Sequence, residues 1–579
     1  MQLLQVRSLL SFARSKPLRT LGALAIVGML LLGVLIATGL AGKIANKVLG
    51  LNGGSTFIDL NRVEATWVPI ETALHDVEMM RIPVGNWTDF GGGGAIEQIG
   101  DTIIIMTPKG EFRYLGSDNV FRALGANVDM QNTAFVESGW LDDPLVRTYW
   151  FRTHDLFVRE LETDRFEIFA SHHRYGNDCV EIVLSRAEII RSGDELTTAN
   201  GGFEPIYTVP PCVGRKAGGF PFAGHQSGGR IQEYSETELL MTTGDLELDG
   251  QNSPIRASAD DEMGLGKVHL INTETSTSQI VAKGLRNPAG LIIAETGRIW
   301  ITDSGPQGGD ELNELVFGSD YGWPEVTYGF NYGYPRRPWP LNPSQGRHDG
   351  SQPYAKPTFV FMPSIAVTNL IEVTAPEFDF WQSDLLVGSL KAQTLYRLRL
   401  EGDRVIYSEA MEINERIRDV IQLQNGRIAL LTDTPHLILL RNGEKAAAAE
   451  SAEATTVVFS SLADVQQAQN KFQPTFTSAK ERGKALFQAN CASCHDAVER
   501  ENHSGPHLVG VVGRKIGSVQ GFAYSERLAG ETRTWTEDRL VSFLMNPNDE
   551  FEGTYMAQVG ELVPHAEWPS VIAYLKDPE

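Results

Sequence analysis

Gly426-Arg-Ile-Ala-Leu-Leu-Thr-Asp433 is a short apolar run that begins at a glycine and ends at a carboxylate. Three other runs resemble it and also end in small or acidic residues: Glu238-Leu-Leu-Met-Thr-Thr-Gly-Asp245, Gly297-Arg-Ile-Trp-Ile-Thr-Asp303 and Asp384-Leu-Leu-Val-Gly-Ser389. Runs of this length bounded by turn-forming residues are typical of β-strands. Recurrent strands with uneven insertions predict a β-propeller, whose blades carry loops around a central channel. A pair of β-sandwiches is the alternative, because the spacing alone does not fix the repeat.

The composition limits what the whole chain can be. At 579 residues it is too long for a single core, so we expect two or three domains. Residues 50–442 show no sustained helical periodicity, and the 57 glycines of the chain suit a turn-rich β protein. With 73 Asp and Glu against 50 Lys and Arg, and no basic patch with interleaved aromatics, nucleic acid is not an expected partner.

A second pattern, Cys491-Ala492-Ser493-Cys494-His495, lies near the C-terminus. The spacing C-x-x-C-H is the pattern of covalent haem attachment. Cys491 and Cys494 would form thioethers with the haem vinyl groups, and His495 would be an axial ligand of the iron. A redox dithiol or half of a zinc site is the alternative, but neither needs a histidine at the fifth position. The motif therefore predicts a one-electron carrier in an oxidising compartment.

The N-terminus carries a candidate membrane segment. Between Arg19 and Lys43 lie 23 uncharged, mostly apolar residues, preceded by several basic residues. This length suffices to cross a bilayer, and the basic flank predicts a cytoplasmic N-terminus. We expect residues 1–45 to form this N-terminus and a transmembrane anchor. Cleavage after Gly39-Leu40-Ala41 is the alternative. In either case the domains that follow are expected on the periplasmic side of the inner membrane.

Two cysteines remain outside the haem motif. Cys179 and Cys212 can pair in an oxidising compartment. Two buried free thiols are the alternative, and the sequence leaves the choice open.

The loops between the strand-like runs carry candidate chemistry. His225 lies in a glycine-rich loop before the strand that ends at Asp245, and a histidine oriented by a carboxylate is the minimal general base for a hydroxyl proton. A histidine satisfied within its own loop is the alternative. Backbone carbonyls beside Gly and Pro, with carboxylates close by, are oxygen ligands of the kind that calcium takes. Such stretches are 284–288, 305–313 and 320–324.

Cations also follow several strands. Lys391, Arg416 and Arg418 lie on loops that would meet at one end of a propeller, where they would converge on a polyanionic ligand. As unrelated surface charges they would have no such role.

In this order the motifs resemble those of the glucose/sorbosone dehydrogenase family, six-bladed propellers that bind pyrroloquinoline quinone (PQQ) and calcium. The resemblance is firm over residues 220–435 and thin over 50–215. It rests on His-Gln-Ser-Gly, Gly-Leu-Arg-Asn-Pro, Gly-Pro-x-x-x-Asp-Glu-x-Asn, Tyr-Gly-Trp-Pro, Ser-Leu-Lys and Arg-x-Arg-Asp-Val. It implies a PQQ-binding all-β propeller domain over residues 50–442.

The resemblance also implies residue roles. His225 matches the catalytic base and Asp245 the carboxylate that orients it. The chain departs from the family in one extra glycine, Gly229, and in Ser304, which leaves the sugar preference open. The positions matching cofactor ligands are Arg286, Asn287, Lys391, Arg416 and Arg418 for the quinone, the carbonyls of Gly305 and Pro306 for its calcium, and Asp310, Glu311 and Tyr321 for a second, structural calcium.

Residues 478–579 resemble a class I cytochrome c, an all-α domain with haem c. The family supplies its sixth iron ligand from Gly-Thr-x-Met, here Met556, and a thioether raises the reduction potential. Met545 is a rival ligand, and a bis-histidine iron would draw on His503, His507 or His565. Residues 443–477, rich in Ala, Glu, Ser, Thr and Gln, are predicted to be a flexible linker.

Together these patterns predict a membrane-anchored periplasmic quinoprotein dehydrogenase. It would oxidise an aldose or related alcohol with PQQ and pass electrons to its own haem, then to a soluble cytochrome c or a terminal oxidase of the respiratory chain. The alternative is an electron-transfer protein whose propeller is a non-catalytic docking module. The set of His225, Asp245, Lys391 and the paired arginines favours the enzyme, because a scaffold has no use for it.

Overall fold

The computed structural model describes residues 62–578, apart from several gaps. The predicted membrane segment, Cys494 and residues 460–477 of the expected linker lie outside the described residues. No helix in the described part of the chain is long and apolar enough to cross a membrane. The gaps are 86–91, 144–145, 147, 200, 217–221, 223, 251–252, 330–352, 449–454, 460–479, 481–482, 485, 488–490, 492–494, 501, 503–504, 546, 552–553, 555 and 557–567.

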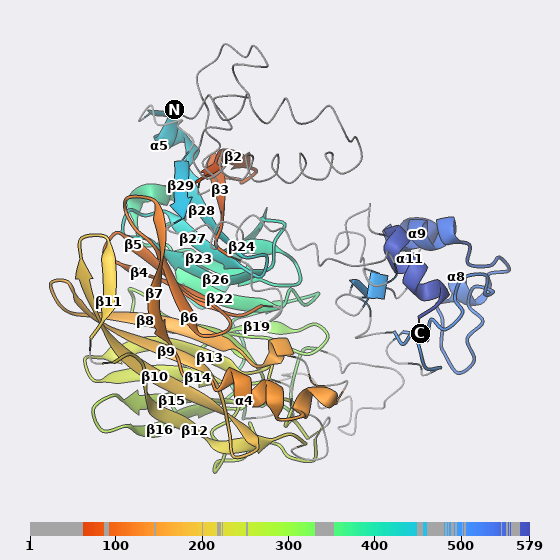
Figure 1. Cartoon of the computed structure of the whole chain (residues 1–579), viewed down its shortest axis with the longest axis horizontal. Coiled ribbons are helices and arrows are strands. Elements are labelled where there is room, and N and C mark those ends of the chain that lie inside the picture. The colour runs from red at the N-terminus through yellow and green to blue at the C-terminus, as the bar shows by residue number, and fades with distance from the viewer. Residues whose placement is uncertain are drawn as a thin grey trace, which may run out of the picture. The chain divides into compact units, whose positions relative to one another are not determined.

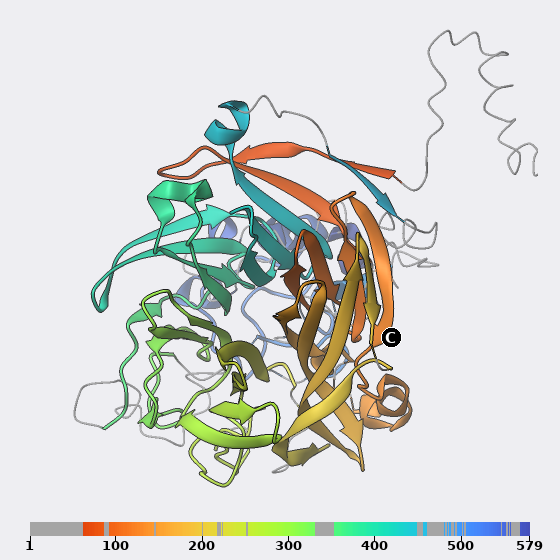
Figure 2. The same ribbon diagram turned by 90° about the vertical axis from the view of Figure 1, so that its left-hand side faces the viewer.

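The described strands form six sheets around a common centre (Figures 1 and 2). Each innermost strand contacts the innermost strand of the next sheet, and the sixth contacts the first. The six-bladed propeller is therefore confirmed. The innermost strands, in chain order, are β4 (Ala95–Ile99), β8 (Thr153–Glu162), β13 (Gly228–Ser235), β17 (Pro288–Ile293), β22 (Val367–Glu372) and β26 (Ile417–Gln422).

The first three blades continue outward from β4, β8 and β13. In blade 1 the outer strands are β5 (Thr102–Met106), β6 (Glu111–Leu115) and β7 (Val120–Asn127). In blade 2 they are β9 (Arg165–Gly176), β10 (Cys179–Ser192), β11 (Glu195–Thr198) and β12 (Glu204–Gly214), of which the last two both pair with β10. In blade 3 they are β14 (Glu238–Thr243), β15 (Lys267–Asn272), β16 (Thr277–Lys283) and β20 (Ser319–Asp320).

The remaining blades continue from β17, β22 and β26. In blade 4 the outer strands are β18 (Ile299–Asp303), β19 (Asp310–Glu314) and β21 (Phe359–Phe361). In blade 5 they are β23 (Leu385–Ser389), β24 (Thr394–Glu401) and β25 (Arg404–Glu412). In blade 6 they are β27 (Ile428–Thr432), β28 (His436–Asn442), β3 (Val77–Pro83) and β2 (Trp67–Ile70).

The four similar runs of the sequence become the second strands of blades 3 to 6. Strands β18, β23 and β27 are buried at every position, and β14 at all but its first. Because each sheet is covered on both faces by its neighbours, these strands are continuously apolar and do not alternate. At the ends of two of these strands, Asp303 accepts from the backbone N–H of Arg286 and Asp433 binds Arg418, so both carboxylates hold residues at one end of the channel.

The ring closes by pairing the two ends of the propeller domain. Strand β3, near the start, pairs antiparallel with β28, near the end, with Pro83 opposite His436. Closure of this kind protects the sheet edges and fixes the last blade against the first.

One buried ion cluster ties the innermost strands together. Arg230 of β13 donates through Nη1 to Asp155 of β8 (2.7 Å) and Asp419 of β26 (2.8 Å), and its Nε donates to a carbonyl oxygen of β17. Asp419 also accepts from Asn369 of β22 (2.8 Å) and from the backbone N–H of Ile96 in β4 (2.9 Å). Removing one partner of such a cluster would leave a buried charge unpaired, at a cost of about 3–5 kcal/mol.

The expected linker begins as ordered structure. Helix α5 (Gly443–Ala448) follows β28, and β29 (Thr455–Phe459) joins blade 1 between β7 and β1 (Arg62–Ala65). Val457 is fully buried in the core between blades 1 and 6. The flexible-linker prediction is therefore wrong for these two elements, because an apolar strand can complete a sheet edge that would otherwise be exposed.

Cys179 and Cys212 form a disulfide, which settles the choice that the sequence left open. It connects the start of β10 to β12, so the bridge lies within blade 2.

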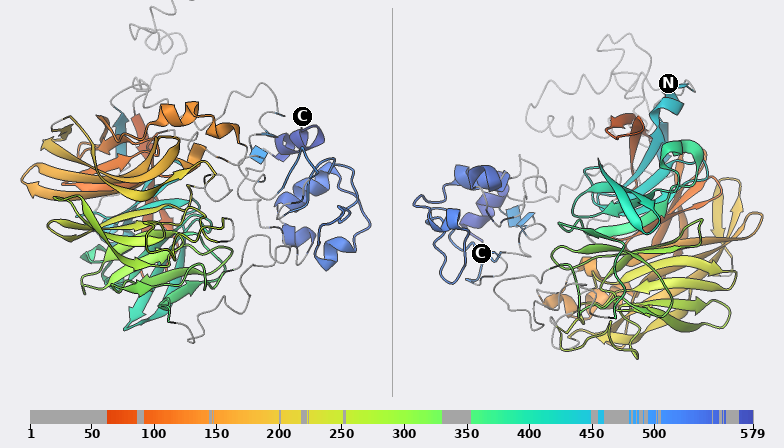
Figure 3. Two further views of the ribbon diagram at one scale, coloured as in Figure 1. Left: turned by 90° about the horizontal axis from the view of Figure 1, so that it is seen from below. Right: turned by 180° about the vertical axis from the view of Figure 1, so that it is seen from behind.

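Helices occur both in the propeller and in the C-terminal domain. The propeller carries α4 (Asn132–Glu137) and the 3₁₀ helices η2 (Trp140–Asp142), η3 (Thr148–Trp150) and η6 (Pro376–Trp381). The C-terminal domain is drawn in blue in Figure 3. It has its own apolar core, which includes Trp535, Phe543 and Trp568. Its described helices are α8 (Glu526–Ala529), α9 (Glu537–Met545), α10 (Pro547–Glu550) and α11 (Trp568–Lys576).

Candidate functional site

A cavity of about 320 Å³ lies at one end of the propeller channel, between the innermost strands and the loops that precede them. Its lining comes from all parts of the ring, including the segment before β8. It gathers most of the site residues expected from the sequence: His225, Arg286, Asn287, Gly305, Asp310, Arg416 and Arg418.

His225 is paired with a carboxylate at the cavity wall. Its Nε2 lies 3.2 Å from Oε1 of Glu247, and its ring lies against that of Trp150 with centroids 4.9 Å apart. Two consecutive left-handed residues, Leu246 (φ 52°) and Glu247 (φ 60°), bring this carboxylate back towards His225. Non-glycine residues rarely adopt this conformation, and such strain clusters at functional sites. Ion pairing with His225 outweighs burial and lowers the pKa of Glu247.

Asp245, expected to orient His225, has a different role. Its Oδ2 accepts a hydrogen bond from Nε1 of Trp323 (2.6 Å), and its Oδ1 accepts from the backbone N–H of Glu247 (2.9 Å). Burial, followed by repulsion from Asp249, raises the pKa of Asp245 well above its usual range. In this structure Asp245 therefore holds the turn that carries Glu247, and Glu247 contacts the histidine. In the sequence, the only sign that Glu247 could contact His225 is that it lies two residues after Asp245.

The cavity lining is also rich in guanidinium groups. Arg416 and Arg418 both bind Asp433, with the Arg418 Nη2 to Asp433 Oδ2 distance 2.8 Å, so two cations share one carboxylate. Arg152 donates to the carbonyl oxygen of His225 (3.1 Å) and has no carboxylate partner in the part of the chain that the structure describes. Burial, with repulsion from Arg418, lowers the pKa of Arg152 to about 9. An anionic ligand would relieve this excess of positive charge.

Arg152 was not found from the sequence, because the region before residue 215 carries no recognisable motif. The packing of blade 2 against blade 3, which sets β8 beside β13, brings it to the cavity.

Arg286 and Asn287 are fixed by the carboxylate at the end of β18. Their backbone N–H groups donate to Asp303 (2.9 and 2.6 Å). Nη1 of Arg286 donates to the carbonyl oxygens of Ser304 and Gly305, both at 2.9 Å. The Gly305 carbonyl, expected to bind the calcium of the cofactor, thus has a guanidinium partner in this structure. Pro306 follows in the same loop and does not line the cavity.

Lys391 does not belong to this wall. Its side chain is exposed, while the preceding residue, Leu390, lines the cavity. Its backbone N–H donates to Ile365, which fixes the loop but not the ammonium group.

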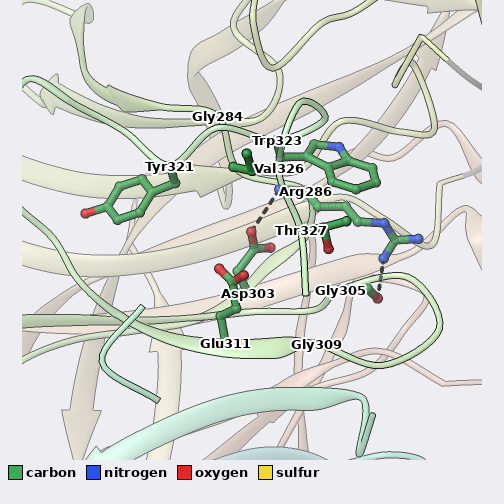
Figure 4. Close-up of a pocket in the computed structure, with 10 residues that line it drawn as sticks. All are labelled: Gly284, Arg286, Asp303, Gly305, Gly309, Glu311, Tyr321, Trp323, Val326 and Thr327. Carbon is green, nitrogen blue, oxygen red and sulfur yellow. Dashed lines mark hydrogen bonds between the residues drawn. The ribbon is translucent and has the colours of Figure 1, made fainter. Parts of the chain in front are cut away.

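A small second cavity of about 10 Å³ lies behind Arg286, where the carboxylates of Asp303 and Glu311 face one another (Figure 4). Burial raises the pKa of Asp303 to about 6. Burial and repulsion from Asp303 raise that of Glu311 to about 8. The negative charge of two facing carboxylates suits a cation. Among the described residues, however, no group of three or more His, Cys, Asp or Glu side chains is placed to hold a metal ion.

The other two residues expected at the structural calcium site have protein partners. Asp310 accepts from Gly305 N–H (3.0 Å), Ser364 Oγ (2.8 Å) and Ala366 N–H (2.7 Å), so it fastens the loop after β18 to the loop before β22. The hydroxyl of Tyr321 donates to the carbonyl oxygen of Glu314 (2.6 Å) and points away from the carboxylate pair (Figure 4). Of the three expected side chains, only Glu311 faces the small cavity with its carboxylate.

The C-terminal domain orients the expected haem ligand. Nδ1 of His495 lies 2.7 Å from the carbonyl oxygen of Pro506, which assigns the ring proton to Nδ1 and leaves Nε2 as the iron-binding atom. Cys491 is buried, one helical turn before His495, whose N–H donates to its carbonyl oxygen. Met556 is partly buried against the core of the domain.

Comparison with known families divides the chain in the same way. Residues 219–441 match the family model Glucose / Sorbosone dehydrogenase, and residues 480–577 match Cytochrome c. The cytochrome c of Euglena viridis is 38% identical over 96 residues, which cover 17% of this chain and 93% of that protein.

Relatives of the propeller match over shorter shares of their length. The aldose sugar dehydrogenase YliI of Escherichia coli is 30% identical over 167 residues, covering 28% of this chain and 43% of YliI. The uncharacterized protein slr1608 of Synechocystis is 29% identical over 279 residues, covering 44% of this chain and 62% of its own. The apo-form structure of the soluble E. coli aldose sugar dehydrogenase covers 63% of this chain and 99% of its own, at 19% identity and a TM-score of 0.49. A likeness at that level carries no functional argument.

Proposed function

Because the chain belongs to the cytochrome c family through its C-terminal domain and carries a glucose/sorbosone dehydrogenase domain, we propose that it is a cytochrome-linked sugar dehydrogenase. It would oxidise an aldose or a related alcohol in the propeller cavity and pass the electrons to its own haem. The observation that carries the proposal is one cavity lined both by a histidine paired with a carboxylate and by four arginine side chains.

The cavity fits PQQ by charge. Three carboxylates on a planar quinone need several fixed cations, and Arg152, Arg286, Arg416 and Arg418 line the same space. Arg416 and Arg418 share the single carboxylate of Asp433, so this pair carries more positive than negative charge. When bound, PQQ supplies a two-electron acceptor for the hydrogen that leaves the substrate carbon.

The protein would supply base and position. His225, at the cavity wall, would take the proton of the substrate hydroxyl, and the ionised Glu247 would stabilise the imidazolium that results. Trp150, packed on the same ring, restricts its orientation and offers an apolar face beside it. In this proposal His225 accepts the proton, Glu247 is its anionic partner, and Trp150 orients the imidazole ring.

Calcium fits at the small cavity and not at the Gly305 carbonyl. The facing carboxylates of Asp303 and Glu311, with pKa values raised to about 6 and 8, favour a divalent cation between them. Such an ion would brace the β18–β19 loop that fixes Arg286 and Asn287. Since the Gly305 carbonyl already accepts from Arg286, no step of the reaction is assigned to an ion there.

We also propose that the protein is anchored in the inner membrane with both domains in the periplasm. The apolar segment 20–42, the haem motif and the Cys179–Cys212 disulfide all support an exported protein. Electrons would leave the haem for a soluble cytochrome c or a terminal oxidase.

The test uses purified full-length protein with its haem attached. Adding PQQ and calcium, followed by a panel of aldoses under anaerobic conditions, should reduce the haem only when all components are present. A Cys491→Ser variant should lose this signal but still reduce an artificial dye with the same sugars. The proposal is wrong if PQQ binds and neither the haem nor the dye is reduced by any aldose or alcohol.

A further inference from the structure

Three buried histidines stand beside the cavity, and the mechanism above uses none of them. His154 lies in β8, and His172 and His173 lie in the neighbouring strand β9. All three are at most 6% exposed. A buried imidazole needs a partner for each ring nitrogen, so their hydrogen bonds show which of them are structural.

His172 and His173 are fully satisfied by the protein. Nδ1 of His172 lies 2.8 Å from the carbonyl oxygen of His173, and its Nε2 lies 2.8 Å from Ser185 Oγ. In His173, Nδ1 accepts from the backbone N–H of Arg152 (3.2 Å), and Nε2 lies 3.0 Å from Ser227 Oγ. Each ring is therefore locked in one neutral form: His172 serves the fold of blade 2, and His173 ties this blade to the loop before β13.

His154 differs from its two neighbours. It lines the large cavity, and its Nε2 is buried without a hydrogen-bond partner in the described part of the protein. Its ring packs edge-on against His173, with centroids 4.4 Å apart, which fixes its position. Leaving a polar atom buried and unpaired costs about 1–3 kcal/mol, a cost that a ligand in the cavity would remove.

The charge state of His154 suits an uncharged ligand group. Burial, together with repulsion from His173 and Arg152, lowers the pKa of His154 well below its usual range. The ring is therefore neutral at physiological pH, with one nitrogen able to donate and one able to accept. The nearby arginines, in contrast, suit carboxylates.

Gly229 provides the space that this histidine occupies. It has φ of +100°, and a Cβ added there would lie 2.4 Å from Cβ and 2.8 Å from Cγ of His154. No other residue fits at position 229 without displacing the ring or the backbone. The positions of Gly229 and of the buried histidine are therefore coupled.

We propose that His154, whose ring packs against Gly229, is a ligand-binding residue that hydrogen-bonds to a hydroxyl or carbonyl oxygen of the molecule in the cavity. The inference rests on the proposed dehydrogenase function and adds a specificity determinant to it. The oxygen belongs either to the sugar or to the quinone, and the two sources give different signatures.

The test compares His154→Phe and His154→Gln with the wild type, in full-length protein with haem attached. PQQ affinity is measured by equilibrium dialysis, which does not depend on activity, and KM and kcat are then measured for several aldoses at saturating PQQ. His154→Phe should weaken binding roughly 5- to 150-fold, the equivalent of one buried hydrogen bond. His154→Gln, which keeps a donor and an acceptor, should lose less. Raised KM with unchanged PQQ affinity assigns the oxygen to the sugar, and weakened PQQ affinity assigns it to the quinone.

His172→Phe is the matched control, because it removes an equally buried ring whose partners are all protein atoms. It should lower the melting temperature and leave both affinities unchanged. If both His154 variants fold and retain wild-type PQQ affinity and KM for every sugar, the inference is wrong while the proposed function stands. If the wild type binds no PQQ and oxidises no sugar, the proposed function fails and this inference fails with it.

Discussion

The two walls of the cavity differ in how their polar groups are balanced. On the wall built by blades 3 and 6, His225 faces Glu247, and Arg416 and Arg418 face Asp433. On the wall built by the segment that leads into β8, Arg152 has no described carboxylate partner and His154 has no described hydrogen bond at Nε2. Groups with protein partners are held in position before a ligand arrives, whereas unbalanced groups contribute by binding the ligand. We therefore expect the first wall to govern the rate and the second to govern affinity.

The largest expected effect tests the first wall directly. His225→Ala should lower kcat for sugar oxidation roughly 10²- to 10⁴-fold, the usual range for loss of a general base, with little change in PQQ affinity. Dye-linked steady-state kinetics measure it. His436→Ala is the matched control, because His436 also pairs with a glutamate, Glu415 (2.9 Å), but does not line the cavity. Equal losses in both variants would show that His225 acts only through the fold.

A smaller loss of kcat should distinguish the role of Glu247 from that of Asp245. Glu247→Gln should lower kcat roughly 10- to 100-fold, because a charged hydrogen bond to the base is worth about 1.5–3 kcal/mol. Asp245→Asn should cost less in kcat, because the raised pKa of Asp245 favours its neutral form. A larger loss in Asp245→Asn, with Glu247→Gln near wild type, would restore Asp245 as the orienting carboxylate.

Two substitutions of cationic residues, one at the cavity and one outside it, test the second wall. Arg152→Met should weaken PQQ affinity roughly tenfold, since it removes a half-buried cation at the cavity with no described carboxylate partner. Lys391→Met, which removes an exposed cation outside the cavity, should change affinity little. Equilibrium dialysis at low and high salt measures both. If Lys391→Met has the larger effect, the cavity closes on its ligand differently from the form described here.

The carboxylate pair beneath the cavity predicts a pH-dependent stability. The folded pKa of Glu311, about 8, lies above its usual 4.5, so the native protein retains a proton that the unfolded chain has lost, and stability falls as pH rises towards 8. In chelator, Glu311→Gln should therefore raise the melting temperature at pH 9 by roughly 2 °C or more and have little effect at pH 5. Calcium should stabilise the wild type and not the variant. Glu314→Gln, a partly exposed partner of Arg298 on the same strand, should show neither behaviour.

The smallest effect on activity is expected away from both walls. Val457→Asp places a charge in the buried position of β29 and should release this strand from blade 1, with unchanged sugar-to-dye activity. Hydrogen exchange over residues 455–459 should rise, while Thr456→Asp, at a half-buried neighbour, should change it less. Unchanged protection in Val457→Asp would show that β29 is not held by this side chain.

The sequence predicted much of the fold and part of the site. The second strands of blades 3 to 6 were recognisable because they are buried on both faces and each ends where a loop meets the channel. His225, Arg286, Asn287, Arg416 and Arg418 were found from short motifs, and all five line the cavity. Such features depend on a few neighbouring residues, so a short window of sequence carries them.

What the sequence determined alone is therefore local: the strand pattern, the haem motif and the loops that bear the base and the paired arginines. The tertiary structure decided which groups meet. Two left-handed residues carry Glu247, and not Asp245, to His225. The packing of blade 2 against blade 3 sets β8 beside β13, which places Arg152 and His154 in the cavity although their own segment carries no motif. These contacts join residues far apart in the chain, and their geometry depends on backbone angles and blade packing that no short stretch of sequence specifies.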